Sequence, residues 1–325
     1  MHSRTTRLLA PSVLALAALG ATLPAATADP ADRSATTITV RPATLPRGDD
    51  PAVPQVLGTT ILDGDARIEV PGREVQLFGT SGDDYVVGVW RNDGGSRVLR
   101  VAADGSRETV VDRIRGDLVL SADGRRLFEA VQRSGGSVVT VRDASTGDEV
   151  GRRPFRGYVR VLDADAGRAV LGGSAPDRTF QWDVAAGTTS RITGREGYFA
   201  DIRADRVGSF TVARGESTCS VLTTLSAPRT ELWRSCRQAV VAASPNGRRL
   251  LTQDLVSDGP VGRLSVHRDH GRRLVTYRTP GAFGVSSWET NRSVLITAYG
   301  AERAALVRCG VDACERASER IGPNG

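Results

Sequence analysis

The sequence is organised by a short unit of two apolar stretches joined by a tight turn, which recurs along most of the chain. Its clearest copy is Ala242–Thr252, where Pro245, Asn246 and Gly247 form the turn. A regular period near forty residues is typical of repeat architectures, in which each repeat is one supersecondary unit. Five copies align on the turn glycine at separations of 42, 43, 41 and 39 residues, and Asn291-Arg292 marks a sixth: Gly82, Gly124, Gly167, Gly208 and Gly247.

Each copy contains four short segments that are rich in Val and Leu and bounded by Gly, Asp, Asn or Ser, which is the signature of β-strands. Four strands in about forty residues predict one blade of a β-propeller. A blade buries its faces only against neighbouring blades, so we expect the repeats to form a ring. The strands expected in the second copy are Leu118–Leu120, Arg126–Val131, Ser137–Arg142 and Glu149–Arg153, and those in the fifth are Val240–Ala243, Arg248–Gln253, Gly262–His267 and Arg273–Tyr277.

Six complete copies fit between Val75 and Gly322. Two further stretches, Val56–Ile61 and Ala66–Val70, lie one period before the outer strands of the first copy. They can add outer strands to the last blade as an N-terminal latch, or form half of a seventh blade. We therefore predict an all-β propeller of six blades with four antiparallel strands each and N-terminal latch strands, with seven blades as the alternative.

The turns between strands resemble those of two known propeller families. Residues 141–147 (VRDASTG) and 181–187 (QWDVAAG) resemble the Trp-Asp-x-x-Thr-Gly ending of WD40 repeats. Residues 121–127 (SADGRRL) and 244–250 (SPNGRRL) resemble the Ser-Pro-Asp-Gly-Lys turn of TolB-type, WD40-like propellers. The resemblance covers residues 75–322 and implies the propeller fold. Propellers of these kinds include scaffolds, receptors and enzymes, so the fold does not define the function.

The N-terminal part divides into two segments before the propeller domain, which we place at 56–325. Residues 1–28 have the layout of a secretory signal peptide, with Arg4 and Arg7 before an apolar stretch and Ala26-Thr27-Ala28 as the cleavage site. We expect secretion to the extracellular space or cell envelope, without stable membrane insertion after cleavage; an uncleaved anchor is the alternative. Residues 29–55 are rich in Pro, Thr and Asp and predict a flexible linker, interrupted by a short β-type stretch at Thr36–Val40.

The charge of the chain argues against a nucleic-acid partner. The formal net charge is +6, and every one of the 43 Lys-or-Arg positions is Arg. Without Arg4 and Arg7 the excess is +4, which is too small and too diffuse for a nucleic-acid footprint. We attribute the exclusive use of Arg to genomic base composition rather than to selection for anion recognition.

The four cysteines predict two disulfides, which suit an oxidising compartment. Cys219 and Cys236 flank the expected outer hairpin of the fourth blade, and Cys309 and Cys314 flank that of the sixth. Directly opposed strand residues have Cα atoms about 4.5–5.5 Å apart, which is within disulfide range. A zinc site that shares all four thiolates is the alternative, although the spacing differs from that of a zinc ribbon.

Three charged residues lie seven positions before the turn glycine in successive copies: Asp117, Arg160 and Asp201. That alignment places them at the start of the innermost strands, near one mouth of the central channel. They can bind a ligand there, or form an inter-blade ion pair that fixes the position of the blades; we favour the ion pair.

The leading functional hypothesis is a monomeric, non-enzymatic binding scaffold that holds a protein, peptide or glycan on its loop-rich face and needs no cofactor or metal. Arg91, Arg133, Arg156, Arg178, Arg195, Arg214 and Arg237, near Tyr158, Tyr198 and Phe283, are the arginines and aromatics expected on that face. Such a composition is frequent at interfaces.

The alternative is a propeller hydrolase or lactonase that holds a divalent metal at the channel mouth. It would need carboxylates gathered around one ion. The suspected acids are Asp117, Asp201, Glu196 and Glu289, whereas His267 and His270 flank an expected turn, where solvated side chains are the rule.

Overall fold

The computed structural model describes residues 35–212, 218–256 and 259–322. The expected signal peptide and Arg214 lie outside these ranges. All the regular secondary structure in the described residues is β-strand. The described residues therefore include no helix of the length and hydropathy that a membrane crossing requires.

The first four blades are separate antiparallel sheets of four strands, as the repeats predict. In the second blade the strands match the expected segments with small extensions at their ends. The first blade contains β5 (Glu74–Ser81), β6 (Asp84–Trp90), β7 (Ser96–Val101) and β8 (Arg107–Val111); the second contains β9 (Asp117–Leu120), β10 (Arg126–Arg133), β11 (Gly136–Asp143) and β12 (Glu149–Arg156). The third contains β13 (Tyr158–Asp165), β14 (Arg168–Ser174), β15 (Arg178–Asp183) and β16 (Thr188–Thr193); the fourth contains β17 (Gly197–Asp201), β18 (Arg206–Phe210), β19 (Ser220–Thr223) and β20 (Glu231–Ser235).

The fifth and sixth blades share one long strand, β24 (Arg273–Trp288). Its first part pairs with β23 and is the outer strand of the fifth blade, whereas residues 282–288 pair with β25 and form the inner strand of the sixth. The two blades are thus one continuous sheet. The other strands of the fifth blade are β21 (Gln238–Ala243), β22 (Arg249–Asp254) and β23 (Val261–Arg268), and those of the sixth are β25 (Val294–Tyr299), β26 (Ala304–Cys309) and β27 (Cys314–Arg316).

A separate three-stranded sheet precedes the first blade in the chain. It contains β2 (Gln55–Leu57), β3 (Thr60–Asp63) and β4 (Ala66–Glu69), and we call it the N-terminal sheet. Leu57 and Leu62 pack against Leu295 and Leu306 of the sixth blade. On the other side, Ile61 and Ile68 join a cluster with residues of the first blade. Of the two placements considered for this segment, the structure shows the partial seventh blade.

The segment of residues 36–52, here named the strap, lies along the outer edges of the fifth and sixth blades. Its strand β1 (Thr36–Thr39) pairs in parallel with β24. Further along, the Gly48 N–H donates to the Arg316 carbonyl (2.9 Å), and the Arg316 N–H donates to the Pro46 carbonyl (2.8 Å). Val40 is fully buried in the core. The linker expected over 29–55 is therefore packed structure from Thr36 onward, because its β-branched run completes a sheet edge and its prolines lie outside the strands.

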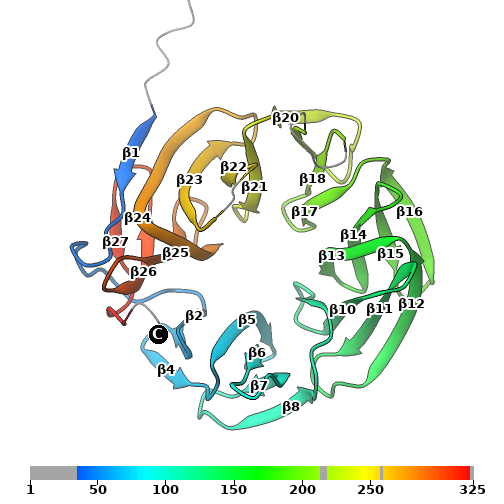
Figure 1. Ribbon diagram of the computed structural model, residues 1–325, viewed down its shortest axis with the longest axis horizontal. Helices are drawn as coiled ribbons and strands as arrows, with labels where there is room; N and C mark the ends of the chain where they lie inside the picture. Colours follow the sequence, from blue (N-terminus) through cyan, green and yellow to red (C-terminus); the bar gives the residue numbers. More distant parts are fainter. Residues whose placement is uncertain (1–34, 213–217, 257–258, 323–325) are drawn as a thin grey trace, which may run out of the picture. The chain divides into compact units, whose positions relative to one another are not determined.

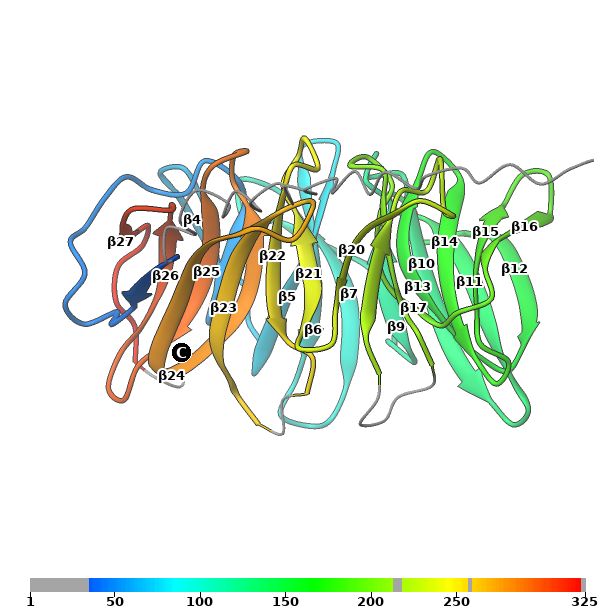
Figure 2. The same cartoon turned by 90° about the horizontal axis from the view of Figure 1, so that it is seen from above.

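The six blades and the N-terminal sheet lie side by side around a central axis, with β2, β5, β9, β13, β17, β21 and the second part of β24 innermost (Figure 1). Seen from the side, the strands run between the two faces of the ring (Figure 2). Apolar side chains of adjacent blades meet between the sheets; Phe128 and Val141 of the second blade cluster with Leu171 and Trp182 of the third. Each blade thus supplies half of the core on either side of it.

Candidate functional site

Two of the three residues expected at the channel mouth occupy equivalent positions. Asp117 of β9 pairs with Ala130, and Arg160 of β13 pairs with Gly172, four residues after the start of β10 and β14 respectively. The two inner strands contact each other. In the described residues, however, no ion pair joins Asp117 and Arg160.

Asp201 lies at the opposite end of its strand from these two residues, where β17 turns into β18. The alignment took Gly208 as the turn glycine, but Gly208 lies within β18. The turn of the fourth blade instead uses Asp205 in the left-handed conformation (φ 56°). The residue that corresponds to Asp117 and Arg160 is Glu196, whose carbonyl accepts the Phe210 N–H (2.9 Å).

The Asp201 carboxylate is committed to its own turn. Its Oδ1 accepts the Ala204 N–H at 2.8 Å, and burial raises the pKa of this carboxyl. Asp163 of the third blade accepts the Ile202 N–H at 2.6 Å, and burial raises the pKa of Asp163 to about 6. A cavity of about 480 Å³ lies beside Asp201 and reaches Trp288, with mainly apolar side chains around it. These carboxylates join blades and close turns.

The acids considered as metal ligands do not converge. Glu289 forms an ion pair with Arg308, whose Nη2 lies 2.8 Å from Glu289 Oε1. Within the described residues no three His, Cys, Asp or Glu side chains gather in a way that could hold a metal ion. His267 is buried rather than solvated: its ring stacks on Trp233 (centroids 5.0 Å apart) and its Nδ1 lies 2.9 Å from the Gly271 carbonyl oxygen.

Both predicted disulfides are confirmed. Cys219 is bonded to Cys236 at the end of the outer hairpin of the fourth blade. Cys309 is bonded to Cys314, and the two residues are direct partners in the β26–β27 ladder. The four thiols are therefore not free to form the zinc site that was the alternative.

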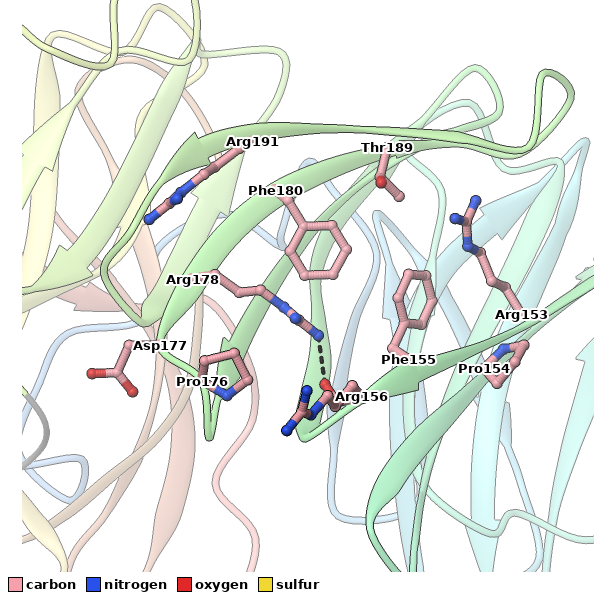
Figure 3. A pocket seen from close by; sticks show the side chains of 10 residues that line it. All are labelled: Arg153, Pro154, Phe155, Arg156, Pro176, Asp177, Arg178, Phe180, Thr189 and Arg191. Atoms are coloured by element: carbon pink, nitrogen blue, oxygen red, sulfur yellow. Dashed lines mark hydrogen bonds between the residues drawn. The ribbon is translucent and has the colours of Figure 1, made fainter.

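A groove of about 540 Å³, here named the rim groove, lies between the outer strand of the second blade and the outer strands of the third. Figure 3 shows Arg191 and Arg153 at opposite ends of a row of side chains, with Arg178 and Arg156 between them. The lining comes from β12, the β14–β15 turn, β15 and β16: Arg153, Pro154, Phe155, Arg156, Pro176, Asp177, Arg178, Phe180, Thr189 and Arg191.

The groove is built from the same local device used twice, an arginine two residues before a phenylalanine. Because side chains two apart on a strand share a face, Arg153 lies over Phe155 (5.5 Å from guanidinium carbon to ring centroid). In the same way Arg178 lies over Phe180 (5.1 Å). The two rings are 5.4 Å apart across the blade boundary. The two stacked Arg–Phe pairs thus bring one guanidinium group from the second blade and one from the third into the same groove.

Backbone carbonyls fix both guanidinium groups further. Arg153 donates to the carbonyl of Gly187, and Arg178 donates to the carbonyl of Arg156, the contact drawn in Figure 3. Arg156 and Arg191 are exposed and donate no hydrogen bond to a residue that the structure describes. Two arginines of the groove are therefore held in place and two are free to move.

The positive charge of the groove is not neutralised. Among the described residues, none of its four arginines forms an ion pair, although Arg152, on the same strand as Arg153, pairs with Glu149 at 2.8 Å. Asp177 is the only acid in the lining, which leaves a formal excess of three positive charges. Like charges that share one groove repel one another, so an anionic ligand gains by entering it.

Sequence reasoning found half of this site. Arg156 and Arg178 were among the arginines expected on the binding face, whereas Arg153 and Arg191 were missed. The repeated Arg-x-Phe spacing at 153–155 and 178–180 was the available signal. This spacing marks a site only because the third blade places Phe180 against Phe155. That contact between blades cannot be predicted from one repeat alone.

Comparisons with known proteins identify the fold. No protein-family model matches the sequence, and no curated protein matches it. Among solved structures, acylaminoacyl peptidase from Pyrococcus horikoshii aligns with a TM-score of 0.57 and 10% identity over 80% of this chain. This chain spans 47% of the peptidase, about half its length.

Two further structures align over most of the propeller. The Cps50 (Swd1) β-propeller domain from Myceliophteria thermophila has a TM-score of 0.51 and 11% identity over 84% of this chain and 89% of that one. TolB from Acinetobacter baumannii has a TM-score of 0.45 and 14% identity over 66% of this chain and 58% of that one. The chain therefore has the β-propeller fold.

Proposed function

We propose that this protein is a non-enzymatic binding scaffold that holds an anionic partner in the rim groove. The observation that carries the proposal is that four arginines from two adjacent blades line one groove and form no ion pair with any acid that the structure describes. Arginine with aromatic side chains is the composition that anchors interfaces. The propeller supplies a rigid frame on which this row of donors is displayed.

The chemistry of the groove favours recognition over catalysis. A guanidinium group keeps its proton at every physiological pH, so Arg153, Arg156, Arg178 and Arg191 donate hydrogen bonds and do not act as bases. The metal-dependent hydrolase finds less support, because Glu289 is paired with Arg308 and the Asp201 carboxylate caps its turn. We therefore place binding ahead of hydrolysis.

We also propose that the protein works outside the reducing cytosol, in the extracellular space or the cell envelope. The two disulfides support this location, because such bonds persist in oxidising compartments.

The test is a thermal melt of the protein with citrate, sulfate and phosphate, each compared with sodium chloride at equal ionic strength. A ligand that binds only the folded state at 100 times its dissociation constant adds about 2.7 kcal/mol of stability. We expect citrate to raise the midpoint of the native protein and of R152Q, but not of the R153Q/R178Q double variant. Equal stabilisation of all three proteins would contradict an anion site in the groove.

A further inference from the structure

We propose that the rim groove binds an extended acidic segment of a partner protein, whose Asp and Glu carboxylates pair with the row of guanidinium groups. This inference rests on the proposed function and specifies the partner. It is carried by three properties of the groove: the way its arginines are held, the way they are spread, and the character of the surfaces between them.

The held arginines present planar donors that match carboxylates. A guanidinium group binds a carboxylate through two parallel N–H···O bonds, which is stronger and more directional than a single contact. Arg153 is fixed by the Phe155 ring and the Gly187 carbonyl, and Arg178 by the Phe180 ring and the Arg156 carbonyl. Donors that are already ordered lose less conformational entropy on binding.

Arg178 also has an unused donor. Its Nε is buried and has no hydrogen-bond partner among the described residues. A buried donor without an acceptor destabilises the protein. A carboxylate that binds this guanidinium group compensates its positive charge. An acidic ligand in the rim groove therefore offsets part of the positive charge of this guanidinium group.

The spread of the arginines favours an extended ligand over a single small anion. Arg191 and Arg153 stand at the two ends of the row in Figure 3. In an extended chain, alternate side chains lie on the same side about 6.5–7 Å apart. An extended segment with acids at alternate positions therefore presents several carboxylates along one side, and a single small anion does not.

The surfaces between the arginines favour a peptide. Pro154, Pro176 and Phe155 are apolar, and they suit an apolar side chain placed between acids. The lining, all of it described, offers one hydroxyl group, Thr189, and no side-chain amide for the many hydroxyls of a neutral sugar. Pro154 has no N–H and the Arg156 carbonyl already accepts Arg178, so β12 offers little for strand addition here. Recognition is therefore through side chains.

The experiment measures fluorescence polarisation of a labelled peptide with alternating Glu and Leu, next to a matched peptide with Gln in place of Glu. The proteins are the native chain, R178Q, R153Q/R178Q and R152Q. Arg152 is the matched control, because it lies on the same strand as Arg153 and carries the same charge but is paired with Glu149. A thermal melt of each protein shows that the fold is retained.

We expect the Glu peptide to bind the native protein and R152Q with affinities within about twofold. R178Q should lower the affinity about tenfold, and the double variant further, since a charge-assisted hydrogen bond contributes about 1.5–3 kcal/mol and 1.4 kcal/mol is tenfold. The Gln peptide should not bind. Added salt should weaken the Glu complex.

Four outcomes would overturn the inference. Equal weakening by R152Q and R178Q would show attraction to net charge instead of binding in the groove. Stabilisation by citrate without binding of the Glu peptide would retain the proposed function and reject the acidic peptide. A sulfated polysaccharide or an RNA that binds in the groove and outcompetes the peptide would assign the groove to that polymer. If no anion changes the melting midpoint and no peptide binds, both proposals would be rejected.

Discussion

On the sixth blade Arg308 is surrounded by acceptors, whereas the four arginines of the rim groove form no ion pair with any acid that the structure describes. Arg308 Nη1 lies 2.8 Å from Glu315 Oε1, Nη2 lies 2.8 Å from Glu289 Oε1, and both nitrogens also donate to carbonyls of the strap at 3.1 and 2.9 Å. Among the described residues, the partners of the groove arginines are two aromatic rings and two carbonyls.

The difference shows how one residue type serves two purposes. Burial that is matched by carboxylates makes Arg308 part of the framework, and the attraction raises the pKa of its guanidinium group. A guanidinium group that has no carboxylate partner contributes little to the stability of the fold and remains available to a ligand. Framework arginines should therefore affect stability, and groove arginines should affect binding.

The largest effect is expected from breaking the framework cluster. R308Q leaves the Glu289 carboxylate, whose side chain is 3% exposed, without its cation, and removal of one partner of a buried pair typically costs about 3–5 kcal/mol. The strap should also detach, because Arg308 bonds to the carbonyls of Asp49 and Asp50. Urea unfolding and limited proteolysis within the strap measure both effects. A loss below about 1 kcal/mol would place the cluster with ordinary surface ion pairs.

Asp163 is the opposite case to the groove arginines. Its carboxylate is largely buried and forms no ion pair with a cation among the described residues. Its pKa is raised to about 6 from 3.8, so the folded state binds the proton more tightly than the unfolded state. Stability from this group is therefore present below pH 4 and is lost as the pH rises to about 6, by about 3 kcal/mol in total. D163N keeps an oxygen acceptor for Ile202 and should remove this loss in denaturant titrations across pH. A D163N variant that keeps the native pH profile would contradict this assignment.

A comparison of two turns sharpens the same contrast. Ser121 Oγ and Ser244 Oγ each accept the backbone N–H five residues ahead at 2.9 Å, so the turns of the second and fifth blades match. Beyond them the second blade pairs Arg126 with Asp143 across the ladder, whereas the fifth blade pairs Arg249 with Arg268.

Burial and the charges of Arg268 and Arg292 lower the pKa of Arg249. R268D should recreate the pair of the second blade and stabilise the protein by up to about 1 kcal/mol in urea unfolding. D143R in the second blade should shift stability by a similar amount in the opposite direction. Destabilisation by R268D would contradict the view that Arg268 and Arg249 repel each other across the ladder.

The smallest effect on stability is expected in the rim groove itself. R153Q/R178Q should leave the free energy of unfolding within about 0.5 kcal/mol of the native value, since the lost contacts are offset by relief of repulsion. The same variant should abolish citrate stabilisation. A loss comparable to that of R308Q would make these arginines framework residues and remove the basis of the comparison.

The fold was accessible from the sequence where the turn chemistry is local. Ser121 and Ser244 close their turns with bonds inside six residues, so the repeats of the second and fifth blades could be recognised and their strands placed. The fourth blade was misaligned because its turn uses Asp205, which adopts the left-handed conformation without being glycine.

The site was less accessible, because it depends on neighbours that are distant in sequence. The composition of the strap predicted a linker, because its partner strand, β24, is more than 230 residues away in the sequence. The rim groove needed the third blade to bring Arg178 and Phe180 against Phe155. Composition alone suggested that the arginines had no selected role, and only the absence of paired acids around these four, within the described residues, separates them from the rest.

The position of the N-terminal sheet has a consequence for the order in which the molecule is completed. Its strands are the first of the propeller to leave the ribosome, but Leu57 and Leu62 are covered by Leu295 and Leu306, which are translated near the end. A nascent chain of any shorter length exposes that apolar seam, and exposed apolar surface on incomplete chains promotes aggregation. Truncation from the C-terminus therefore damages the part of the propeller that was made first.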